Sequence, residues 1–161
     1  MLRRHRRIAL ENSVHFITIV TRERGYWFKD DACCRGVLES FEHHRRRLDL
    51  VCHAYVLMPD HLHALLLQES EGELIPDLVR EFKKWTSRRC SPADYSGQSL
   101  WQDGYDDVGV PGSEAARTKI EYIHDNPVRK GMLERPEQYL WSSAREYWEV
   151  GKGIVEITKP W

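Results

Sequence analysis

Two histidines with one residue between them are the side chains in this sequence best suited to chemistry. His61 and His63 lie in YVLMPDHLHALLL, residues 55–67, a run that is otherwise apolar apart from one Pro-Asp pair. Burying an imidazole among apolar side chains costs free energy unless the ring is hydrogen-bonded or coordinated. Residues two apart on a strand point to the same side, so both rings should face the open side of a sheet while Leu62 and Ala64 face helices. The pair is therefore a candidate set of metal ligands.

A metal site needs a third ligand, because H-x-H pairs also occur as ordinary core histidines. EYIHDNPVRKG, residues 121–131, offers one, since Tyr122 and Asn126 are i, i+4 neighbours on a predicted helix and present a phenol and an amide on one face. The alternative is a tyrosine packed at a helix edge, with Asn126-Pro127 acting only as a helix stop. The sequence alone leaves both interpretations open.

Apolar periodicity predicts the elements that must position these residues. Strands are expected at 14–21, 50–57 and 61–68, with a turn at 58–60 and a short strand near 100–106; helices are expected at 30–48, 75–89, 113–125 and 142–148. Ser113 is the expected N-cap of the third helix, and Pro127 is expected to stop it. This order predicts an α+β fold, an antiparallel sheet with helices packed on it.

Length and composition indicate one ordinary globular domain over residues 1–161, with a basic N-terminal arm at 1–12 and a tail at about 149–161. Apolar residues make up 41% of the chain, and no apolar run approaches the roughly 20 residues that span a bilayer. The apolar stretch after the arm is too short for a signal peptide. We expect an intracellular, cytoplasmic protein without membrane contact. The four cysteines lack CxxC spacing, which suits a reducing compartment and argues against structural zinc: Cys33, Cys34, Cys52 and Cys90.

The net charge of −1 does not indicate a nucleic-acid partner, but the distribution of charge allows one. Basic side chains gather in the arm, in a triplet at 45–47 and along the helix at 75–89. The residues that we expect to contact DNA are Arg3, Arg4, Arg6, Arg7, Arg80, Lys83, Lys84 and Arg88. The alternative for each cluster is a solvated face.

Three separated motifs resemble one family. HAYVLMPDHLHALL, LWQDGYDD and KIEYIHDNPVRKGMLERPEQYLWSSA together resemble the REP-associated tyrosine transposases, single-tyrosine HUH transposases related to small bacterial insertion-sequence transposases. The likeness extends from Val14 to about Tyr147. It implies an HUH endonuclease fold of the ferredoxin-like or RRM-like type. It also implies DNA transposition and recombination on palindromic repeats that fold as hairpins with a single-stranded foot.

The resemblance also implies roles for particular residues. His61 and His63, with Leu62 as spacer, would bind Mg²⁺ or Mn²⁺ with Asn126 as third ligand. Tyr122 would attack a DNA phosphate and form a 5′-phosphotyrosine, which a 3′-hydroxyl later resolves without ATP. The protein would act as a monomer or a homodimer, with the tyrosine in cis or in trans.

Other interpretations remain open at this level. A domesticated protein could bind repeat hairpins without mobilising DNA, and a metallo-hydrolase could use the histidine pair, although no HExxH motif supports the latter. Tyr105 is the next candidate nucleophile. Trp85, Trp101 and Tyr105 could stack on bases or pack in the core. The segment 107–112 lacks the basic residue expected from the family, and Asp106 and Asp107 are expected in a solvated loop rather than at the metal.

Overall fold

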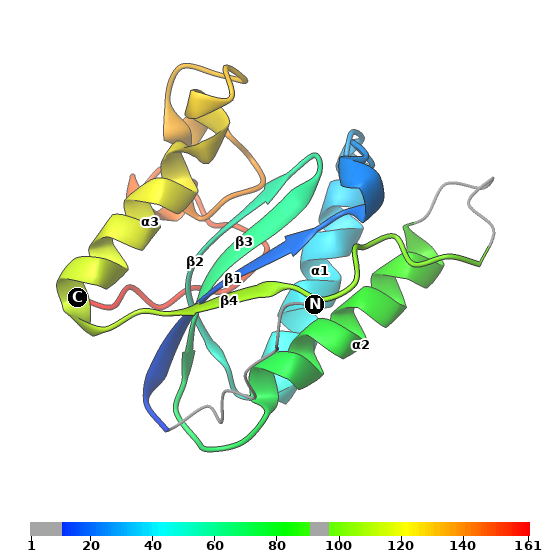
Figure 1. Cartoon of the computed structure of the whole chain (residues 1–161). Helices are drawn as coiled ribbons and strands as arrows, with labels where there is room; N and C mark the ends of the chain where they lie inside the picture. Colours follow the sequence, from blue (N-terminus) through cyan, green and yellow to red (C-terminus); the bar gives the residue numbers. More distant parts are fainter. Residues whose placement is uncertain (1–10, 91–96) are drawn as a thin grey trace.

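The computed structural model describes residues 11–90 and 97–161, and it has a four-stranded antiparallel sheet at its centre (Figure 1). The strands are β1 (Ser13–Val20), β2 (Val51–Met58), β3 (His61–Gln68) and β4 (Asp106–Gly109), in the order β2-β3-β1-β4. The predicted α+β class is confirmed. The arginines of the N-terminal arm lie outside the described residues.

One face of the sheet carries α1 (Asp31–Arg47) and α2 (Leu74–Arg89). Strand alternation sends Leu62, Ala64 and Leu66 into this layer, as predicted, and the main apolar core forms there. The rings of Phe41 and Phe82 meet edge to face between the two helices, with centroids 5.7 Å apart. This face is a packing surface.

The opposite face, which we expected to be open, is covered by α3 (Gly112–Arg129), as Figure 1 shows. A second apolar cluster joins Phe16 and Leu65 of the sheet to Ile120 and Ile123 of α3. The short helices η2 (Pro136–Gln138) and α4 (Ala144–Tyr147) follow in the chain. The apolar stripe of α3 explains the cover, because that stripe must itself be buried.

The bounds of α3 differ from the prediction. Its N-cap is Pro111 rather than Ser113, and Pro127 lies inside the helix, which continues to Arg129. A proline this close to the end removes only one hydrogen bond, and the Lys130 amide still donates to the Asn126 carbonyl at 3.1 Å. Gly131, with φ 72°, ends the turn. The extra turn adds Arg129 to the helix.

The fourth strand also lies later than predicted. Within the expected strand at 100–106, Trp101 forms one isolated bridge with Thr21, while the ladder with β1 is made by Asp106–Gly109. Gly104, with φ 75°, turns the chain between these two pairings. Asp106 and Asp107 thus lie in an edge strand, and the expectation of a solvated loop is wrong.

Among the residues described here, no helix has the length and apolar character needed to cross a membrane.

Candidate active site

All four residues predicted to form the site line one cavity of about 420 Å³, where the ends of β1 and β3 meet α3. His61 and His63 come from β3, and Tyr122 and Asn126 come from α3. The two imidazole centroids are 4.5 Å apart, and each histidine is only 6% exposed. Residues distant in sequence are therefore assembled by the packing of α3 on the sheet.

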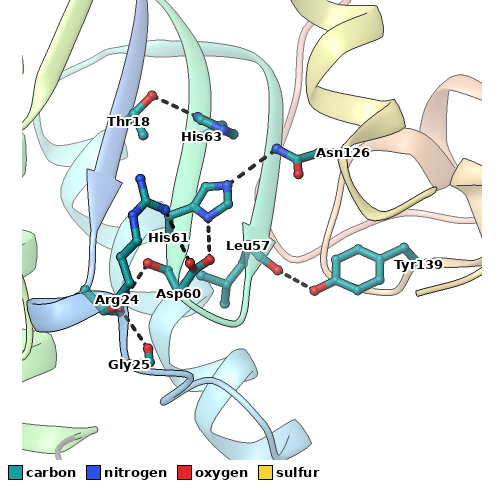
Figure 2. Close-up of polar contacts among 10 residues, drawn as sticks. Thr18, Arg24, Gly25, Leu57, Asp60, His61, His63, Asn126 and Tyr139 are labelled. Carbon is teal, nitrogen blue, oxygen red and sulfur yellow. Dashed lines mark hydrogen bonds and ion pairs between the residues drawn. The ribbon is translucent and has the colours of Figure 1, made fainter. Parts of the chain in front are cut away.

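Hydrogen bonds at both ring nitrogens orient His61 (Figure 2). Its Nδ1 lies 2.6 Å from Oδ1 of Asp60, and its Nε2 accepts a hydrogen bond of 3.4 Å from Nδ2 of Asn126. A carboxylate on Nδ1 fixes the tautomer that leaves the Nε2 lone pair available, the arrangement common behind metal-bound histidines. Arg24 approaches the other oxygen of Asp60 at 3.4 Å.

His63 is oriented by the neighbouring strand. Thr18 lies directly opposite His63 in the β1–β3 register, and its Oγ1 is 2.9 Å from His63 Nδ1. The ring stacks on Phe16 with centroids 5.1 Å apart and planes inclined by 26°. A hydrogen bond to Nδ1 leaves Nε2 as the nitrogen able to bind a ligand.

Burial keeps both imidazoles neutral. It lowers the pKa of His63 to about 3, and the neighbouring His61 ring and the Arg129 guanidinium act in the same direction, because positive charges close together repel one another. The pKa of His61 is also lowered, chiefly by burial, although the Asp60 carboxylate opposes that shift. Neutral imidazole is the form that coordinates a cation, so these rings need no deprotonation step at neutral pH.

The donor set fits a divalent cation. An amide can turn to exchange its oxygen and nitrogen, and turning Asn126 would direct Oδ1 towards the histidine nitrogens. One amide oxygen and two imidazoles leave positions for phosphate oxygens and water. Across the described residues no cluster of three or more His, Cys, Asp or Glu side chains could hold a metal ion, so this mixed set is the candidate site.

Tyr122 lies at the mouth of the cavity and is 40% exposed. Its ring centroid is 5.6 Å from that of His63 and 5.9 Å from that of Phe16. The guanidinium of Arg129 lies 4.2 Å above the Tyr122 ring, and the ammonium of Lys119 lies 5.9 Å from it. The phenol is thus both accessible to a large substrate and surrounded by positive charge.

Sequence reasoning missed several residues around the cavity. Asp60 was interpreted only as a turn residue, yet a carboxylate directly before an H-x-H pair is a usable signal for a supporting group. Thr18 carries no such signal, because its role depends on strand register. The remaining cations that line the cavity are Arg24, Arg129 and Lys130.

The residues predicted to contact DNA on α2 lie on the other face of the sheet. Arg80 pairs with Asp77 at 3.0 Å, and Lys83 donates to the carbonyls of Gln102 and Gly104. Lys84 and Arg88 are exposed. Their binding to DNA stays a prediction, separate from the histidine cavity.

The aromatic and acidic alternatives do not line the cavity. Trp101 is fully buried and donates from Nε1 to Thr86 Oγ1 at 2.7 Å, which confirms its interpretation as a core residue. Tyr105 packs against the same core, on the α1–α2 face. Asp107 bonds His15 Nδ1 at 2.8 Å, and Asp106 is exposed.

Comparison with known proteins finds transposases. The family model described as "Transposase IS200 like" matches residues 10–126. A REP-associated tyrosine transposase of Escherichia coli K12 is 22% identical over 104 residues, which are 65% of this chain and 59% of that protein. A Haemophilus influenzae Rd protein assigned as a REP-associated tyrosine transposase is 22% identical over 151 residues. The match covers 86% of this chain and 84% of that protein. The match thus spans less than two thirds of the E. coli relative.

Solved structures show the same fold. A REP-associated tyrosine transposase bound to a REP hairpin superposes with a TM-score of 0.74 at 18% identity, covering 99% of this chain and 93% of the other. A Deinococcus radiodurans R1 protein assigned as a transposase gives a TM-score of 0.50 at 24% identity. That match covers 78% of this chain and 97% of the other chain. The expected family resemblance is confirmed.

Proposed function

Because this chain belongs to the IS200-like transposase family, we propose that it is a metal-dependent DNA endonuclease and strand transferase that acts on hairpin-forming, single-stranded DNA through Tyr122. The observation that carries this proposal is that Tyr122, His61 and His63 share one cavity with a rim of cations. A nucleophile, a pair of neutral imidazoles and positive charge are the groups that phosphoryl transfer needs.

The chain's own residues bind and orient the phosphate. Arg24, Arg129 and Lys130 line the cavity and attract the phosphodiester. The Tyr122 hydroxyl gives its proton to water and its oxygen attacks phosphorus. The bond to the 3′-oxygen breaks, and that oxygen takes a proton from water and leaves as a 3′-hydroxyl. The DNA stays linked as a 5′-phosphotyrosine. A 3′-hydroxyl then attacks this phosphorus and releases Tyr122, so the phosphoester energy is conserved.

The metal would be held by His61, His63 and Asn126. Mg²⁺ or Mn²⁺ at these residues would polarise the scissile phosphate as a Lewis acid. Asp60 and Thr18 hold the two rings so that their Nε2 atoms remain available. The short distance between Tyr122 and His63 within one chain supports attack in cis, by a monomer or by each subunit of a homodimer.

A single substitution tests the nucleophile. Tyr122→Phe removes only the phenolic oxygen, so we expect the covalent protein–DNA adduct to disappear while hairpin binding remains. The assay uses an oligonucleotide labelled at its 3′ end, with Mn²⁺, Mg²⁺ or EDTA, on denaturing gels. Tyr105→Phe is the matched control and should leave the adduct unchanged. An adduct that survives Tyr122→Phe would refute the assignment.

Hairpin binding without cleavage by the wild-type protein in either metal would favour the alternative, a domesticated repeat-binding protein.

A further inference from the structure

A second and larger cavity, about 920 Å³, lies between α1 and the C-terminal part of the chain. Five basic side chains line it, three from α1 and two from the later segment: Arg35, Arg46, Arg47, Arg145 and Lys152. We call this cavity the α1 groove. None of its residues lines the histidine cavity.

The α1 groove has an excess of available positive charge. Its two acidic residues are Glu39, which is exposed, and Glu42, which is engaged by Arg45 at 2.6 and 2.8 Å from its two carboxylate oxygens. Five cations against these two carboxylates leave a positive excess. Arg46 lies within 3.9 Å of that same carboxylate. Within the ranges 11–90 and 97–161, no ion pair involves Arg35, Arg47 or Lys152. These three cations remain available to an anionic partner.

The spacing of the cations suits an extended polyanion. Arg35 and Arg47 are separated by twelve positions on one helix, or about 18 Å at 1.5 Å per residue. Phosphates of one DNA strand repeat every 3.4 Å or so along the duplex axis, so this distance corresponds to about five base pairs. Small-molecule pockets are lined mainly by apolar side chains, whereas most side chains that line the α1 groove are charged.

The segment that follows η2 joins the α3 layer to the α1 groove. Tyr139 packs with Ile123 in the α3 layer and donates from its hydroxyl to the Leu57 carbonyl at 2.5 Å. Trp141 accepts from the Leu57 amide at 2.8 Å and lines the α1 groove. Leu57 is the second-to-last residue of β2, and the turn that leads to His61 follows Met58. The segment therefore ties the α1 groove to the end of β2 that precedes His61.

A duplex fits the α1 groove better than an unpaired strand does. Proteins hold unpaired strands by stacking bases on aromatic rings. Among the described residues, two aromatic side chains line the groove: Trp141, which packs against both apolar clusters, and His43, whose ring meets that of His44 edge to face. Neither is a large aromatic ring standing free in the groove. Arginines and lysines without a stacking platform contact the sugar-phosphate backbone of paired DNA.

We propose that the α1 groove binds the double-stranded stem of the DNA hairpin whose unpaired foot enters the histidine cavity. This inference rests on the proposed function and identifies a substrate-binding surface beyond the N-terminal arm and α2. Arg47 at the end of α1 and Lys152 in the segment after α4 would contact the phosphates of the stem.

The test uses the double variant Arg47→Ala/Lys152→Ala and two fluorescent oligonucleotides, a hairpin with its foot and the foot alone. Affinity is measured by anisotropy between about 50 and 200 mM salt. Loss of two phosphate contacts should lower the slope of log K against log salt by about 2, so the fourfold salt increase should weaken hairpin binding about tenfold less than in wild type. Binding of the foot should not change. The charge-conserving variant Arg47→Lys/Lys152→Arg should retain the wild-type slope.

The control is Lys29→Ala/Arg117→Ala, which removes the same charge from exposed residues outside both cavities. It should leave the slope unchanged. An unchanged hairpin slope in Arg47→Ala/Lys152→Ala, or an equal loss for hairpin and foot, would overturn the inference. Those outcomes leave the Tyr122 adduct intact, whereas a wild-type protein that forms no adduct would contradict the proposed function instead.

Discussion

The two faces of the sheet are built from alternate residues of the same strands, yet they differ in kind. On the α1–α2 face, Leu62, Ala64 and Leu66 are fully buried in an apolar core. On the α3 face, their neighbours His61 and His63 are almost as buried but border a cavity. The first face stabilises the fold, and the second keeps polar groups ready for a ligand.

The polar face tolerates its histidines because each has a hydrogen-bond partner. A buried polar group without a partner costs roughly 1–3 kcal/mol. Asp60 and Thr18 meet that requirement for one nitrogen of each ring, and the second nitrogens face Asn126 or the cavity. The comparison therefore predicts that substitutions on one face change stability and substitutions on the other change metal binding and chemistry.

The largest effect is expected on the packing face. Leu62→Ala should lower the free energy of unfolding by about 3 kcal/mol, because it leaves a cavity beneath α1 and α2. Urea denaturation would measure the loss. The matched substitution His63→Ala removes a side chain of similar size from the same strand but should cost less stability, since its ring borders existing space. A greater loss for His63→Ala would show that the two faces do not divide in this way.

The next effect concerns the carboxylate behind His61. Asp60→Asn keeps the shape of the side chain but weakens the orientation of Nδ1, so the affinity for Mn²⁺ should fall about 10- to 100-fold. Calorimetric titration of the folded protein would measure this fall. Asp107→Asn is the control on the other side of β1, where the carboxylate contacts His15, and it should leave Mn²⁺ affinity unchanged. Equal losses in both variants would indicate a general charge effect.

A smaller effect is expected at Thr18. Thr18→Val removes the hydroxyl that contacts His63 Nδ1, and a neutral hydrogen bond contributes about 1 kcal/mol, or roughly fivefold in Mn²⁺ affinity. Thr18→Ser keeps a hydroxyl and should restore most of the affinity. If Thr18→Ser binds Mn²⁺ as weakly as Thr18→Val, packing of the methyl group rather than the hydrogen bond orients His63.

The smallest effect is expected from α2, on the packing side. Arg88→Ala should reduce the salt slope of DNA binding by about 1, uniformly across sequences, and leave adduct formation at saturating DNA unchanged. Anisotropy titrations measure the slope and denaturing gels measure the adduct. An unchanged slope would show that the α2 stripe is a solvated surface, the alternative that its sequence also allows.

Local patterns predicted the parts of the fold that depend on local physics. The strands at β1, β2 and β3 follow from alternation and β-branched residues, and their positions agree with the structure. The sequence of β4 has no strand pattern. This segment is a strand because its backbone pairs with the free edge of β1. Pro127 indicated a helix end, but burial of α3 on the sheet outweighed that signal.

The same distinction applies to the site. His61, His63, Tyr122 and Asn126 were identified from motifs, and the structure brings them together. Thr18 could not be identified, because its place opposite His63 depends on strand register. The α1 groove was equally hidden, since α1 and the segment around Lys152 are far apart in sequence.

We expect Tyr122 to become covalently linked to DNA beside the histidine pair. The most direct test is tryptic mass spectrometry of the protein–DNA adduct formed with Mn²⁺ and trimmed by nuclease. Cleavage after Lys119 and Arg129 releases IEYIHDNPVR, in which Tyr122 is the only tyrosine. A nucleotide is expected on this peptide. A nucleotide on the peptide that contains Tyr105, with IEYIHDNPVR unmodified, would contradict it.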